Sequence, residues 1–165
     1  MNLKIVSVDQ IPLAGPVPLD NLEEVYKVCL ELKNLCEMHE GVGISAVQAG
    51  IPWNLFLVKA DCYSSFDVCD TYGYFINCEY TPVGENKIDS IEGCLSLLHE
   101  NGNLRFYKLQ RWAKIKVTGK KLKKNKDLIL TDFSIELTKT NQGVVFQHEI
   151  DHQNGILIDS FGKEI

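Results

Sequence analysis

The stretch His148-Glu149-Ile150-Asp151-His152 has the pattern H-E-x-x-H, which predicts a helix that carries a metal site. Residues four apart lie one turn apart on the same helix face, so the two imidazoles can converge on one cation. Glu149 stands beside the first histidine, where its carboxylate can reach a water on the metal rather than the metal itself. The alternative is a surface helix with two solvated histidines. Accidental matches are expected about 0.007 times in such a chain, which favours the metal site.

A hydrolytic metal ion usually takes three protein ligands and leaves one position open for water. Cys94, in the short segment Glu92-Gly93-Cys94-Leu95-Ser96, is the candidate for the third ligand. A thiolate beside two imidazoles would give a tetrahedral site with a water in the fourth place. Taken alone, however, a free cysteine is more simply interpreted as a small buried apolar residue.

A glycine-containing segment, Gly41–Gln48, reads GVGISAVQ and is a third candidate part of the site. Glycines let the backbone approach a ligand closely, and an extended stretch can pair with a bound peptide as an added strand. Gln48 supplies a neutral donor that can polarise a carbonyl. Alone, this segment would be interpreted as the end of a helix leading into a buried strand.

Together, the three segments resemble the peptide deformylase family, whose motifs are approximately G-φ-G-φ-A-A-x-Q, E-G-C-φ-S and H-E-x-D-H. Here they read GVGISAVQ, EGCLS and QHEIDH. The first motif departs at Ser45, where the family usually has alanine, and at Val47, where proline is common. The resemblance covers nearly the whole chain, and EGCLS separates it from metallopeptidases that share only H-E-x-x-H.

The resemblance implies an α+β fold in which antiparallel strands pack around a central metal-binding helix, in one catalytic domain over residues 1–165. It implies a metal-dependent hydrolase that removes the formyl group from N-formylmethionyl peptides and releases formate. Glu149 would act as general base and then acid, while the Gln48 side chain and the Leu95 backbone N–H would stabilise the oxyanion. The implied metal ligands are Cys94, His148 and His152.

Substrate contacts are also carried over from the resemblance. The backbone edges expected to hold the peptide main chain are those of Val42, Gly43 and Gly93. Val144 and Val145 precede His148 by four and three residues, on the same helix face. They are either walls of a methionine pocket or core residues.

The donor set of one cysteine and two histidines suits zinc. Deformylases, however, are similar in working best with ferrous iron. The resemblance therefore implies Fe²⁺ as the cofactor, with Zn²⁺ or Ni²⁺ able to substitute.

Composition limits the remaining function classes. A net charge of −5 and a pI of about 5.4 argue against a general nucleic-acid or anionic-membrane binder. No apolar run is long enough to span a membrane, and the N-terminus lacks the apolar region of a secretory signal. Six scattered cysteines favour reduced thiols in a cytosol-like compartment, with disulfide pairing as the alternative. The resemblance implies the cytoplasm of a bacterium or a phage-infected bacterium, with an organelle as the alternative. A monomer is expected.

The helix before the glycine segment is predicted from a cap and an apolar stripe. Asp20, with Glu23 three residues later, resembles a capping box, and Gly41 would end the helix. The apolar stripe of this first helix consists of Leu22, Val25, Cys29, Leu32 and Leu35 or Cys36. For the H-E-x-x-H helix, Thr140 or Asn141 is the expected cap.

Strands are predicted at 53–58, 74–78, 104–109, 113–118 and 128–137, and a loop at 60–72. The lysine-rich stretch Gly119–Asp127, with five lysines, is expected to be a solvated hairpin tip; a contact with RNA or an acidic partner is the alternative. His39 and His99 are expected at the surface.

Few residues follow His152, whereas bacterial deformylases commonly continue into a C-terminal helix linked to ribosome docking. We therefore expect a member with a short C-terminus, and if the ribosome is a partner, Lys120, Lys121 and Lys123 are the expected contacts.

The nearer rival function is an endopeptidase, which would need a downstream third ligand such as Asp159 or Glu164. The more distant rival is a binding protein with a structural metal, which would not need Glu149.

Overall fold

The strands of this chain form two antiparallel sheets in the computed structural model, which describes residues 1–59, 72–139 and 142–165. One sheet has five strands in the order β1-β2-β3-β6-β7, and the other has three in the order β4-β5-β8. The strands are β1 (Gly43–Ser45), β2 (Leu55–Lys59), β3 (Tyr72–Pro82), β4 (Lys87–Leu98), β5 (Leu104–Trp112), β6 (Lys114–Lys124), β7 (Leu128–Thr138) and β8 (Lys163–Glu164).

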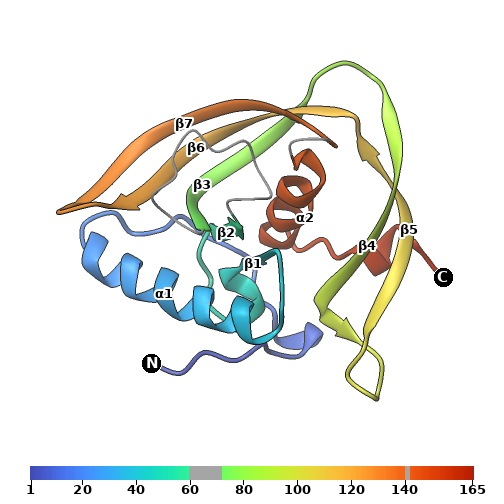
Figure 1. The fold of residues 1–165 in the computed structure, drawn as a ribbon, viewed down its shortest axis with the longest axis horizontal. Helices are drawn as coiled ribbons and strands as arrows, with labels where there is room; N and C mark the ends of the chain where they lie inside the picture. The colour runs from blue at the N-terminus through green and yellow to red at the C-terminus, as the bar shows by residue number, and fades with distance from the viewer. Residues whose placement is uncertain (60–71, 140–141) are drawn as a thin grey trace.

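Helix α2 (Gly143–Gln153) lies between the two sheets and contacts β5 as well as every strand of the five-stranded sheet (Figure 1). The helix begins after Gln142, whose φ of 74° is left-handed. Gly143 is required at the first position because a Cβ there would lie 2.9 Å from the Thr138 carbonyl oxygen. The predicted caps Thr140 and Asn141 lie outside the described residues. The expected α+β fold, with antiparallel strands around a central helix, is confirmed.

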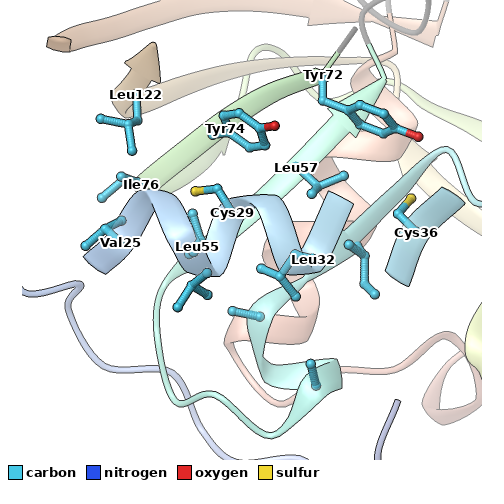
Figure 2. Close-up of a cluster of buried hydrophobic side chains, with 14 of the residues drawn as sticks. Val25, Cys29, Leu32, Cys36, Leu55, Leu57, Tyr72, Tyr74, Ile76 and Leu122 are labelled. Atoms are coloured by element: carbon cyan, nitrogen blue, oxygen red, sulfur yellow. The ribbon is translucent and has the colours of Figure 1, made fainter. Parts of the chain in front are cut away.

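The second helix, α1 (Leu22–Met38), packs on the opposite face of the five-stranded sheet. Alternation along β2 separates the two faces, since side chains of successive strand residues point in opposite directions. Leu55 and Leu57 join the cluster under α1, which Figure 2 shows, whereas Phe56 and Val58 join the cluster under α2. The sheet is therefore covered on both faces.

The cap of α1 is Asn21, whose side chain accepts a hydrogen bond from the Glu24 backbone N–H at 3.2 Å. The prediction of Asp20 as the cap was wrong by one position. Asn21 is equally suited to cap a helix, so residue type alone did not decide between them. The expected apolar stripe is confirmed as buried from Val25 to Cys36, with Leu22 partly buried.

The segment EGCLS, for which the sequence predicted no secondary structure, lies within the long strand β4. One further expectation needs correction. Most of the lysine-rich stretch belongs to β6, and only residues 125–127 form the hairpin turn with β7. The predicted loop at 60–72 lies outside the described residues except for Tyr72, which begins β3.

Three short 3₁₀ helices complete the described elements: η1 (Val8–Gln10), η2 (Ala46–Ala49) and η5 (Ile158–Ser160). His39 and His99 are exposed, as expected. In the described residues, no helix is both long and apolar enough to cross a membrane. The cysteines described there, Cys29, Cys36, Cys78 and Cys94, are buried free thiols.

Candidate metal centre and active site

The three predicted metal ligands come together from two elements. Cys94 extends from β4, while His148 and His152 lie one turn apart on α2. One ligand atom from each residue can be chosen so that all three lie within 4.8 Å of one another. The Cys94 Sγ lies 3.4 Å from the His152 Nε2, and the two imidazole centroids are 4.7 Å apart.

This geometry fits a tetrahedral cation. Bonds of about 2.0–2.3 Å to sulfur and nitrogen place neighbouring ligand atoms about 3.3–3.8 Å apart. The sulfur-to-nitrogen separation of 3.4 Å already falls in this range. The chemistry of the donor set also suits a divalent metal such as zinc or iron.

Glu92 orients the first histidine. Its Oε1 lies 2.8 Å from the His148 Nδ1, which leaves the Nε2 of that ring free to face the other ligands. Although burial opposes ionisation, hydrogen bonds from Arg111 and His148 lower the pKa of Glu92 to about 2. The carboxylate therefore stays charged and holds the imidazole in one orientation.

Arg111 connects this carboxylate to α2. Its Nε and Nη2 donate to the two Glu92 oxygens at 2.9 and 2.8 Å, and its Nη1 donates to Asp151 at 2.5 Å. Asp151 also accepts a hydrogen bond from the Tyr80 hydroxyl at 3.0 Å. Removing one member of such a buried network typically costs about 3–5 kcal/mol, so the network fixes β4 against α2.

Without a cation, the pKa values of the two candidate ligand histidines are shifted in opposite directions. Burial lowers the pKa of His148, but hydrogen bonds with Cys94 and Glu92 outweigh it and raise the pKa to about 10. Burial, followed by the charges of His148 and Arg111, lowers the pKa of His152 well below its usual range. His152 is therefore neutral, as a metal ligand must be, and a cation bound at these residues would displace the proton from His148.

Glu149 is buried beside the ligands, with 4% of its surface exposed. Burial is the main cause that raises the pKa of its carboxyl to about 7. A cation at the three ligands would lower this value again, because an opposite charge favours the ionised form. With a cation bound, the carboxylate is therefore ionised at neutral pH and can accept a proton.

Gln48 lies in η2, directly after β1, and its side chain is held in a fixed orientation. Its Oε1 accepts the Ser45 backbone N–H at 2.9 Å. Its Nε2 donates to the Ser96 hydroxyl at 2.9 Å and lies 3.6 Å from the Cys94 Sγ. The amide donor therefore points toward the ligand sulfur.

A cavity of about 320 Å³ opens onto these groups. Every predicted site residue except the buried His152 lines it, including Leu95 and the predicted peptide contacts Val42, Gly43 and Gly93. Leu95 lies where the pairing of β4 with β5 shifts register, a feature that often occurs next to active sites. Val144 and Val145 both line the cavity, and Val145 also packs against the core.

Sequence reasoning assigned no role to Glu92, Arg111 or Asp151. Glu92 could have been found, because residues two apart in a strand face the same side and it precedes Cys94 by two. Asp151 stands inside the H-E-x-x-H stretch but faces away from the ligands toward Arg111. Nothing in the sequence singles out Arg111.

The family model for polypeptide deformylase matches residues 12–163 of this chain. Peptide deformylase 2 of Bacillus subtilis is 32% identical over 142 residues, covering 81% of this chain and 67% of the relative. The peptide deformylase of Aquifex aeolicus is 32% identical over 144 residues, covering 81% of this chain and 75% of the relative.

A solved structure agrees with the sequence comparisons. The crystal structure of peptide deformylase from Thermotoga maritima matches with a TM-score of 0.71 at 26% identity, covering 98% of this chain and 97% of the other. The chain therefore belongs to the polypeptide deformylase family and is a metal-dependent hydrolase that removes the formyl group from N-formylmethionyl peptides.

Proposed function

We propose that Cys94, His148 and His152 hold the catalytic metal and that Glu149 is the general base of the deformylation reaction. The convergence of one sulfur and two nitrogens beside a buried carboxylate is the observation that supports this assignment most strongly. A cation with this donor set supplies an acidic water and an electrophile at neutral pH. Glu149 takes a proton from the attacking water and later delivers it to the leaving nitrogen.

The oxyanion of the tetrahedral intermediate is assigned to two donors, the Gln48 Nε2 and the Leu95 backbone N–H. The hydrogen bond from Ser45 to the Gln48 Oε1 supports this role, because it turns the amide donor toward the cavity. One such donor is typically worth about 2.7–4 kcal/mol of barrier.

The substrate peptide is proposed to lie along β1. In the described part of the chain, β1 is an outer strand of its sheet, so it can accept an extended peptide as an added strand. Gly43 and the Val42 N–H are proposed to contact the peptide on this side and Gly93 on the other, since the Val42 carbonyl oxygen already accepts the Lys59 backbone N–H at 2.9 Å. The methionine side chain is assigned to the apolar wall formed by Val144 and Val145.

We propose Fe²⁺ as the metal in the cell, with Zn²⁺ or Ni²⁺ able to replace it. The mixed sulfur and nitrogen donor set accepts all three ions. We also propose that residues 1–165 act as one catalytic domain, as a monomer in the cytoplasm. The contacts of α2 with strands of both sheets support the single domain.

The direct test is formate release by anaerobically purified protein, with metal analysis of the same sample. Formyl-Met-Ala is expected to yield formate at a rate that follows the iron content, and unformylated peptides are expected to remain intact. Cleavage of the unformylated peptides would instead support an endopeptidase. Against that rival, neither Asp159 nor Glu164 belongs to the cluster of Cys94, His148 and His152 found among the described residues.

The lysine-rich β6–β7 hairpin is our proposed contact with the ribosome. The contacts expected from the sequence, Lys120, Lys121 and Lys123, are only partly exposed, and Lys120 pairs with Asp132 at 2.8 Å. The exposed lysines of the hairpin, Lys116, Lys124 and Lys126, are therefore the better candidates. Changing these three exposed lysines to glutamate is expected to abolish cosedimentation with ribosomes at low salt and leave formate release from a short peptide unchanged. Unchanged cosedimentation would rule out this surface.

A further inference from the structure

The hydroxyl of Ser45 touches Glu149 at two points. The Ser45 Oγ lies 2.7 Å from the Glu149 backbone carbonyl oxygen and 3.2 Å from its Oε2. Ser45 is the last residue of β1 and is fully buried, so water does not compete for this contact. The hydroxyl can donate its proton to either oxygen, and both acceptors belong to the same residue.

The backbone of the same serine holds a second functional group. The Ser45 N–H donates to the Gln48 Oε1 at 2.9 Å, and the Gln48 Nε2 in turn donates to the Ser96 hydroxyl. A single residue therefore contacts both the proposed base and a proposed oxyanion donor.

The other side of the Glu149 carboxylate is bounded by Gly43. A Cβ built on Gly43 would lie 3.0 Å from the Glu149 Oε1. Gly43 and Ser45 are two apart in β1 and so face the same side of the sheet, toward α2. β1 thus leaves room for one carboxylate oxygen and offers a hydroxyl to the other.

We propose that Ser45 is a positioning residue for the reaction: its hydroxyl fixes Glu149 while its backbone N–H fixes Gln48, so that base and oxyanion donor keep a set separation. This inference rests on the proposed function of those two residues. Terminal torsions of glutamate side chains are broad, and small misplacements of a catalytic group are costly. A hydrogen bond to an ionised carboxylate is among the stronger ones and is suited to restrict it.

The test is the variant Ser45→Ala, which removes the hydroxyl, and with it the capping contact to the Gln48 backbone N–H, but keeps the Ser45 N–H that holds the Gln48 side chain. We expect kcat for formyl-Met-Ala to fall about tenfold, with KM, metal content and the urea unfolding midpoint close to wild type. Ser90→Ala is the matched control, because Ser90 is also a buried serine in a strand and is expected to leave kcat unchanged.

A double-mutant cycle separates positioning from a general structural effect. In the Glu149→Gln background, Ser45→Ala is expected to change the residual rate less than twofold, because the base on which it acts is already absent. A second tenfold loss in that background, or a Ser45→Ala enzyme as fast as wild type, would overturn the inference. Failure of the wild-type protein to release formate would instead overturn the proposed function itself.

Discussion

Replacing Glu149 by glutamine is expected to lower kcat for formate release by about 10³-fold while metal content stays close to wild type. The substitution keeps the size of the side chain but removes its ability to accept a proton. The carboxylate is not one of the three clustered ligand residues, so the cation should still bind. Formate release and metal analysis on the same preparation would measure both quantities.

A matched control for this variant is Asp159→Asn, which also neutralises one carboxylate. Asp159 is exposed on η5, and it was the downstream residue that an endopeptidase mechanism would require. We expect this control to keep wild-type kcat. If Glu149→Gln retained most of the activity, Glu149 would not be the base and the assignment would be wrong.

Replacing Cys94 by alanine is expected to give a protein that binds little metal and releases formate only at background rates. Two imidazoles would remain, and catalytic sites of this kind normally need three protein ligands to hold the ion. Metal content per chain should fall together with activity. Because ligands must be deprotonated to bind, acidification should strip metal from the wild-type protein as well.

Cys29→Ala is the control for loss of a buried thiol. Cys29 packs in the cluster under α1, so removing its thiol should lower the free energy of unfolding but leave the metal content per chain unchanged. A Cys94→Ala protein with a full complement of metal would show that the cation binds elsewhere. The ligand assignment would then have to be abandoned.

The parts of the site that could be predicted are those encoded by local spacing. His148, Glu149 and His152 are separated by helical intervals, so their relation survives any arrangement of the rest of the chain. The position of Cys94 beside them depends instead on how β4 packs against α2, and no local rule gives that distance. For this third ligand, the resemblance between motifs supplied what spacing could not.

Arg111 shows why site residues outside the three motifs were not predicted. Its role depends on two carboxylates that come from β4 and α2, and a single arginine in an alternating strand looks like any exposed one. The lysine-rich stretch was misread for a related reason. Lys120 and Lys121 lie in β6 opposite Asp132 and Thr131, so the strand continues through a segment whose composition suggested a turn.

The three predicted ligands come from two elements, β4 and α2, and this has a consequence for folding. An ion held by these residues would tie the sulfur of β4 to the nitrogens of α2 and would therefore crosslink the small sheet to the central helix. An ion that binds only the native arrangement adds its binding free energy to the free energy of unfolding. The metal would thus stabilise the fold as well as support catalysis, and in a cell short of the metal the protein would be both inactive and less stable.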